Sequence, residues 1–232
     1  MVDIHTHILP FVDDGSDSLN DSCRMIKDEL AMGVQNIILT PHVLRVGMPR
    51  LSKQEYLDHF TIFKTEIQKD CKVNLYLGQE VAYHPQIIKY LQNNQLLTIN
   101  NTSYLLLELP FFEPIKDYDE FFYSCNVLNY KIIIAHIERY HYLTYSDLLS
   151  LKKYSVLYQI NSNSLTGESG RKLKKLSFKM IKDGLVDLVG SDVHAYRKND
   201  LALAYQTVAL NFSVNEAKRI FIDNPHTFFY IK

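Results

Sequence analysis

Histidines and aspartates gather at the start of the chain in a pattern that could bind metal. The chain opens with MVDIHTHILPFVDDG, in which His5 and His7 are two residues apart and Asp13 and Asp14 are adjacent. Side chains alternate along a strand, so an H-x-H pair in a strand presents both imidazoles on one face. Imidazoles and carboxylates brought together in this way are suited to binding a divalent cation.

Further candidate ligands lie where later hydrophobic runs end. They are His42 in TPH, Glu80, Glu108, His136, and Asp192 with His194 in GSDVH. Burying so many imidazoles and carboxylates together without a cation would be very costly. The set contains no thiolate, which indicates Mn, Fe or catalytic Zn. Carboxylates can bridge ions, so these ligands suffice for two or three metal ions, a cluster that generates hydroxide near neutral pH and binds phosphoryl oxygens. The remaining histidines fall outside the pattern: His59, His84, His141 and His226.

Two arginines lie close to these candidate ligands in the sequence. Arg139 follows His136 by three residues in HIERY, and Arg197 follows His194 by three. Either guanidinium could bind a phosphate monoester through two hydrogen bonds, although each could also be an ordinary surface arginine.

The elements that must position these residues alternate between short strands and amphipathic helices. The predicted strands are VDIH (2–5), 36–40, 73–80, 104–109, 131–136, 156–161 and 186–192. Helices are expected from about Ser18 to Gly33, near 53–69 and from Pro85, with others between the later strands. This alternation predicts an α/β fold, a distorted seven-stranded (β/α) TIM-like barrel formed by one domain over residues 1–232. All strands of such a barrel end at one rim, where active sites are built, so the candidate ligands are expected to converge there.

Composition excludes several classes of protein. The chain has 232 residues and a net charge of −1, which provides no long-range field for attracting nucleic acid or anionic lipid. The basic run RKLKK (171–175) is expected on the exposed face of a helix. No apolar stretch approaches the ~18 residues of a membrane helix, and no signal peptide is visible. Three scattered cysteines fit a reducing compartment, for which the cytoplasm is the default expectation.

Other hydrolase signatures are missing from the sequence. A cysteine-dependent tyrosine phosphatase needs an arginine six residues after its cysteine, and Glu29, Leu77 and Lys131 occupy that position instead. The sequence has no GxxxxGK[ST] and no GxSxG, so neither a P-loop nor a serine hydrolase is indicated.

These motifs together resemble the PHP (polymerase and histidinol phosphatase) metallo-phosphoesterases over essentially the whole chain. More narrowly, the sequence is similar to the manganese-dependent tyrosine-protein phosphatases of bacterial capsule and exopolysaccharide operons. The resemblance rests on DIHTHILPFVDDG (3–15), TPH (40–42), GQE (78–80), LLLEL (105–109), AHIERY (135–140), GSDVH (190–194) and FIDNP (221–225). It implies a distorted seven-stranded barrel, the PHP fold, with a trinuclear metal site.

The resemblance also implies how the ligands are shared among three ions. One ion would be bound by His5, His7, Glu80 and Asp192, a second by Glu80, Glu108 and His136, and the third by Asp14, His42 and His194. Asp14 is chosen by the motif, whereas the spacing alone leaves Asp13 and Asp14 open. Two or three Mn ions are expected, with Fe or Zn as alternatives.

The function implied is hydrolysis of phosphotyrosine in protein, with a tyrosine autokinase of polysaccharide export as the partner. Hydroxide formed at two ions would attack phosphorus, while Arg139, with Arg197 as a second candidate, would neutralise developing charge. His42 or His194 could protonate the leaving group. Three alternatives differ in substrate or class: a phosphoesterase acting on a small monoester such as histidinol phosphate, a non-catalytic kinase-binding module, and a nucleic-acid-processing enzyme, which the absence of a basic surface disfavours.

Overall fold

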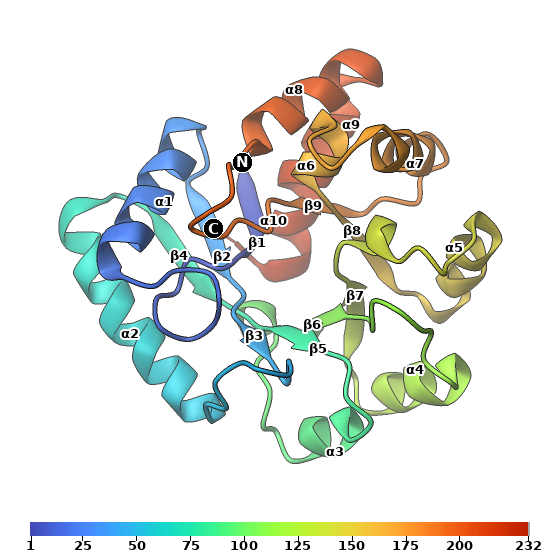
Figure 1. The fold of residues 1–232 in the computed structure, drawn as a ribbon, viewed down its shortest axis with the longest axis horizontal. Helices are drawn as coiled ribbons and strands as arrows, with labels where there is room; N and C mark the ends of the chain where they lie inside the picture. Colours follow the sequence, from blue (N-terminus) through green and yellow to red (C-terminus); the bar gives the residue numbers. More distant parts are fainter. Residues whose placement is uncertain (232) are drawn as a thin grey trace.

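Parallel strands form the centre of the molecule, and helices surround them (Figure 1). The computed structural model describes residues 1–231. Its strands are β1 (Val2–Thr6), β2 (Asn36–Leu39), β3 (His42–Val43), β4 (Asn74–Leu77), β5 (Glu80–Ala82), β6 (Tyr104–Glu108), β7 (Lys131–Ile134), β8 (Leu157–Asn161) and β9 (Leu188–Gly190). They pair in two parallel sheets, with the order β1-β2-β4 in one and β3-β5-β6-β7-β8-β9 in the other.

Helices follow nearly every strand, as expected for a parallel sheet with crossover connections. They are α1 (Leu19–Ala31), α2 (Lys53–Asp70), α3 (Ile87–Gln92), α4 (Tyr118–Val127), α5 (Tyr145–Leu151), α6 (Ser162–Thr166), α7 (Arg171–Lys182), α8 (Leu201–Asn211), α9 (Val214–Lys218) and α10 (Asn224–Phe229). The Ser18 side chain accepts a hydrogen bond from Asp21 N and starts α1, and Gly33 follows its end with a φ of 79°. A capping box between Ser52 and Glu55 starts α2. The predicted starts of these two helices are therefore confirmed.

The two sheets meet at both of their ends, so the parallel sheet curls. Gly78 N donates to Leu39 O at 2.8 Å and Glu80 N donates to Pro41 O at 3.1 Å, which carries the pairing of β2 with β4 over to β3 with β5. On the other side, His7 N donates to Val193 O at 3.0 Å and links β1 to the segment after β9. The α/β class is confirmed, but the predicted strands 36–40 and 73–80 are each interrupted and continue as β3 and β5.

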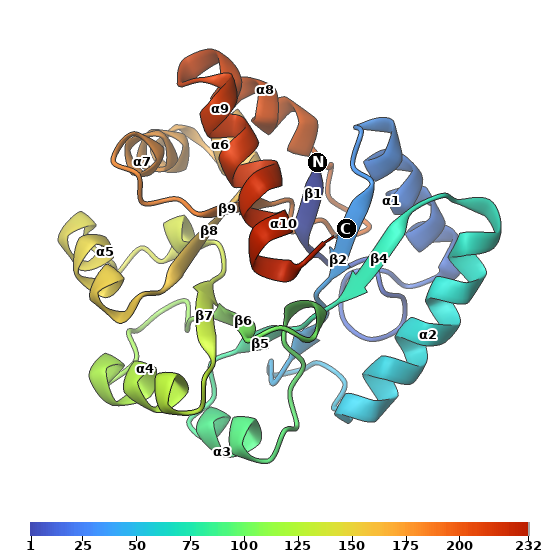
Figure 2. The same ribbon diagram turned by 180° about the vertical axis from the view of Figure 1, so that it is seen from behind.

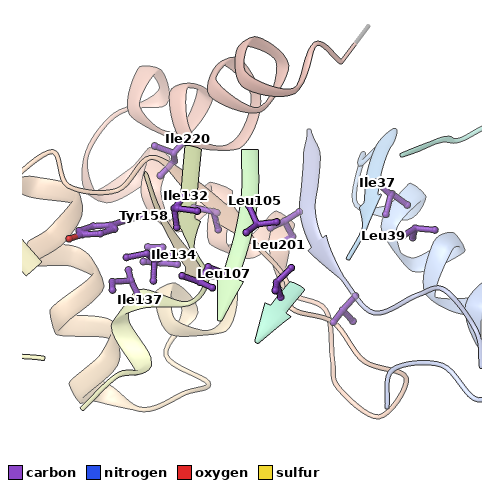
Figure 3. Close-up of a cluster of buried hydrophobic side chains, with 14 of the residues drawn as sticks. Ile37, Leu39, Leu105, Leu107, Ile132, Ile134, Ile137, Tyr158, Leu201 and Ile220 are labelled. Atoms are coloured by element: carbon purple, nitrogen blue, oxygen red, sulfur yellow. The ribbon is translucent and has the colours of Figure 1, made fainter. Parts of the chain in front are cut away.

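The alternating side chains of the strands divide the core into two layers. Leu105, Leu107 and Ile134 lie in the large cluster between the sheet and the helices (Figure 3). Leu106 and Ile133 point the other way and belong to a second cluster inside the curled sheet. Seen from behind, α10 lies across the end of the sheet near β1, where Phe229 completes this inner cluster (Figure 2).

The basic run at 171–175 opens α7, as predicted. Met180 is fully buried on this helix, and Leu173 and Leu176 are half-buried. Lys172 and Lys175 are exposed, whereas Lys174 is half-buried and donates a hydrogen bond to Thr166 O. Among the helices of residues 1–231, none is both long and apolar enough to cross a bilayer.

Candidate metal centre

A register shift in β1 directs the first two histidines into the site. Val2 and Ile4 lie in the inner cluster, and the pairing of β1 with β2 shifts between Asp3 and Thr6. A bulge of this kind changes which side chains face inward. His5 and His7 consequently point inward beyond the apolar residues, with their Nε2 atoms 3.3 Å apart.

Glu80 lies at the centre of the histidines. Its Oε2 is 2.8 Å from His42 Nδ1, 3.3 Å from His5 Nε2 and 3.4 Å from His7 Nε2, while its Oε1 is 2.8 Å from His136 Nε2. The carboxylate is fully buried, at the start of β5. Both oxygens of Glu80 therefore lie where they would be able to bind a cation together with the histidines.

The two adjacent aspartates take different positions. Asp14 Oδ1 lies 3.6 Å from His42 Nε2 and 3.5 Å from His194 Nε2, within the candidate ligand set. Asp13 Oδ2 instead accepts a hydrogen bond from His7 Nδ1 at 2.7 Å and one from the His42 backbone N–H at 3.0 Å. Asp13 thereby leaves His7 Nε2 free to bind an ion, which favours Asp14 as the ligand.

The remaining candidates approach from the ends of later strands. Asp192 Oδ1 is 3.4 Å from His7 Nε2, and Glu108 Oε1 is 3.8 Å from His136 Nε2. His136 and Asp192 have positive φ values of 32° and 54°. Such left-handed backbone is strained in non-glycine residues and is common at functional sites.

Seven of the nine predicted ligands fall into three overlapping groups, each with its donor atoms within 4.8 Å of one another, and His136 and Asp192 contact members of these groups. The groups are His7 with Asp14, His42 and His194; His5 with His7 and Glu80; and His42 with Glu80 and Glu108. The histidines that the pattern left out belong to none of these groups.

The donor set fits divalent cations. The Nε2 atoms of His5 and His7 face each other. If neither atom carries a proton, no hydrogen bond can form between them. Glu80 Oε2 is buried without a hydrogen-bond donor, although three histidine nitrogens surround it. A cation accepts electron pairs from all of these atoms at once, and nitrogen with oxygen ligands suits Mn, Fe or Zn.

Burial shifts the pKa values of two of these groups strongly. Burial, together with the charge of nearby Glu80, raises the pKa of Glu108 to about 8. Burial lowers the pKa of His136 to about 4, in spite of its hydrogen bond to Glu80. Bound cations would favour carboxylate and neutral imidazole, the protonation states that coordinate metal.

Both predicted arginines reach the edge of the metal centre. Arg139 Nη1 and Arg197 Nη1 each donate to Asp192 Oδ2 at 3.1 Å, and each side chain is about one-third exposed. A third arginine was not predicted as a site residue: Arg45 contacts the His42 ring and lies 3.9 Å from Glu108 Oε1. Its position in the loop after TPH was the only sequence signal for it.

Two amides were also missed. Gln159 and Asn161 lie on β8, and Gln159 Oε1 accepts hydrogen bonds from His5 Nδ1 at 3.1 Å and from His136 N at 2.8 Å. Asn161 Nδ2 donates to Asp192 Oδ2 at 2.9 Å. A sequence signal for these amides was available. Gln159 and Asn161 are two residues apart, like the members of the ligand pairs, and they end the predicted strand 156–161, which supplies no candidate ligand.

Two glycines allow the backbone to approach the histidines. A Cβ on Gly15 would lie 2.1 Å from the His7 carbonyl oxygen, and one on Gly190 would lie 2.6 Å from His5 Cβ. Neither distance is sterically possible, which explains the glycines in DDG and GSD.

The fold and this site define a class: parallel α/β proteins with a candidate metal centre of histidines and carboxylates at the carboxyl ends of the strands. The family model described as capsular polysaccharide synthesis, CpsB/CapC, matches residues 1–230. The chain belongs to this family.

Individual relatives agree with this assignment. The chain is 36% identical over 202 residues to CapC of Staphylococcus aureus, covering 84% of this chain and 77% of CapC. It is 30% identical to the tyrosine-protein phosphatase CpsB of Streptococcus agalactiae, covering 98% and 97% of the two chains. A crystal structure from work on YwqE of Bacillus subtilis and CpsB of Streptococcus pneumoniae, described as metal-dependent tyrosine phosphatases, superposes with a TM-score of 0.88 at 29% identity, covering 94% of this chain and 90% of that one.

Proposed function

We propose that this chain is a metal-dependent phosphatase that hydrolyses phosphotyrosine in protein. The observation that carries the proposal is the convergence of histidines and carboxylates from β1, β3, β5, β6 and the segments after β7 and β9, in a chain of the CpsB/CapC family. Relatives of similar length are tyrosine-protein phosphatases, and one superposing structure is of a metal-dependent enzyme of this kind.

The ligands we assign are the nine named by the sequence. One ion would be held by His5, His7, Glu80 and Asp192, a second by Glu80, Glu108 and His136, and a third by Asp14, His42 and His194. We propose Mn as the metal, because neutral imidazoles mixed with several carboxylates suit it.

The residues around the ions would divide the chemical work. When bound, the ions lower the pKa of water and stabilise charge on phosphoryl oxygens. Arg139 and Arg197, which share the Asp192 carboxylate, would bind the phosphate and neutralise charge as the ester bond breaks. A phenolate leaves readily, and His42 or His194 would be the group that protonates it.

The substrate we propose is a tyrosine-phosphorylated autokinase of capsule or exopolysaccharide export, which extends the family's description to a partner. We place this activity in the cytoplasm, where the free thiols of Cys23, Cys71 and Cys125 would stay reduced. We further propose that residues 1–232 form one domain, a distorted seven-stranded barrel in which β2 with β3 and β4 with β5 each count as one interrupted strand.

The test is a phosphatase assay on protein stripped of metal and reloaded with Mn. A phosphotyrosyl peptide, a phosphoseryl peptide and histidinol phosphate are compared side by side. The proposal predicts Mn-restored turnover that is selective for the phosphotyrosyl peptide. Turnover of histidinol phosphate alone would retain the metal chemistry and overturn the protein substrate, and silence on all three would favour a non-catalytic binding module.

His136→Ala tests the metal centre. Loss of this ligand should lower turnover at least about 100-fold, because ligands and their supports act as a unit. His59→Ala, which removes an exposed histidine of α2 that belongs to none of the metal groups, is the matched control. A fully active His136→Ala protein would refute the assigned cluster.

A further inference from the structure

A hollow opens directly beside the metal centre on the side of Arg139. Its volume is about 380 Å³, and it is lined by Phe111, Phe112, Arg139, His141, Tyr142 and Leu173. Three of these side chains carry six-membered aromatic rings, and the one permanent charge is the guanidinium of Arg139. The hollow therefore offers apolar surface next to a cation.

Phe111 and Arg139 connect the hollow to the metal ligands. The Phe111 ring stacks on the His136 ring, with centroids 5.7 Å apart and planes at 17°. Arg139 Cζ lies 5.1 Å from the centroid of the same phenyl ring, while Arg139 Nη1 donates to Asp192. A phosphate held by Arg139 would thus lie next to the aromatic ring of Phe111.

Phe112 is almost fully exposed to solvent, so its ring contributes no buried apolar area to the fold. Its side chain is 97% exposed, in the loop between β6 and α4 that follows the ligand Glu108. Exposed apolar area of this size is unfavourable in water, and it is removed when an apolar group binds against it.

We propose that this hollow binds the phenyl ring of phosphotyrosine and that Phe112, with Phe111, selects for it. The inference rests on the proposed function and deepens it. In phosphotyrosine the ring is attached directly to the phosphate ester oxygen, so a phosphate at Arg139 places the ring against Phe111 and Phe112. A phosphoserine has only a methylene at this position and leaves the aromatic surface uncovered.

The test measures binding of two phosphonates to the Mn-loaded protein by isothermal titration calorimetry. Phenylphosphonate carries the ring and methylphosphonate does not. The wild-type protein should prefer phenylphosphonate, and Phe112→Ala should reduce the ratio of the two affinities by about two- to tenfold, the range of one aromatic contact. Phe112→Tyr should restore most of the preference, since it restores the ring.

Phe11→Ala is the matched control, because Phe11 is also exposed but lies in the loop after β1, outside the hollow. This variant should keep the wild-type affinity ratio and activity. No phenyl preference in the wild-type protein, an unchanged ratio in Phe112→Ala, or an equal loss in Phe11→Ala would overturn the proposal.

Kinetics on a phosphotyrosyl peptide separates this inference from the proposed function. Phe112→Ala should raise KM for the peptide by a factor similar to the loss in phenylphosphonate affinity. A wild-type protein that prefers phenylphosphonate but does not hydrolyse the peptide would refute the proposed function and leave the ring site standing. Hydrolysis of the peptide without any phenyl preference would refute the ring site and leave the function standing.

Discussion

Gln159 is fully buried between the candidate ligands His5 and His136, and its Oε1 atom accepts a hydrogen bond from each of them. An acceptor at His5 Nδ1 fixes the tautomer in which Nε2 carries no proton and can face an ion. The Gln159 Nε2 atom donates to Asn161 Oδ1 at 2.8 Å, and Asn161 in turn donates to Asp192. One amide thus positions ligands from three strand ends.

Gln159→Leu should weaken metal binding by about 10- to 100-fold, the usual effect of removing a group that orients a ligand. The measurement is a titration of the stripped protein with Mn, with circular dichroism as a check of folding. Gln54→Leu, on the exposed side of α2, should bind Mn like the wild-type protein. Equal Mn affinity in the two variants would show that Gln159 does not position the metal ligands.

At the scale of elements, α1 packs against β1 through a buried pair of carboxyl groups. Asp3 on β1 and Glu29 on α1 are both fully buried, and burial raises the pKa of each. The charge of Asp3 raises the pKa of Glu29 further, well above its usual value of 4.5, while Asn199 donates a hydrogen bond to it. Glu29 therefore stays protonated in the folded protein at pH values where it ionises in the unfolded chain.

This difference predicts a pH-dependent stability. Protonated Glu29 contributes its full stability below pH 4.5, and that contribution is lost as the pH rises toward the raised pKa of the folded state. Glu29→Gln is neutral throughout, so within this window the wild-type protein should lose about 1.4 kcal/mol per pH unit relative to the variant. Urea unfolding of both proteins from pH 5 to 8 measures the difference, and parallel curves would contradict it.

At the scale of the whole molecule, the metal centre joins strands that are far apart in the sequence. His5 and His7 come from the first strand, Asp192 and His194 from the end of the last one, and Glu80 lies between them. Ions bound only by the folded chain stabilise it by a free energy that grows with the logarithm of their affinity.

Removal of metal should therefore destabilise the whole fold. A chelator should lower the Tm of the Mn-loaded protein by about 5–10 °C, the shift expected when ligand at 100 times its Kd is withdrawn from a chain of this size. His136→Ala should show a smaller decrease in Tm, and His59→Ala should show the full decrease. Identical shifts in the three proteins, or none, would show that the cluster does not hold the ions that stabilise the fold.

The sequence by itself determined the class of the fold and the chemistry of the site. Strand and helix periodicity is local, so the alternation of elements and the starts of α1 and α2 could be read directly. Strand ends in a parallel sheet share one rim, so the convergence of the candidate ligands could be expected from the topology.

Only the tertiary structure decided which atoms meet. The interruptions after β2 and β4 depend on pairing with distant strands, for which a short apolar run carries no local signal. The different positions of Asp13 and Asp14 depend on where His7 and His42 lie, and the amide of Gln159 becomes important only because β7 and β1 bring His136 and His5 to it. Contacts between residues distant in the sequence are set by packing, which one-dimensional periodicity does not encode.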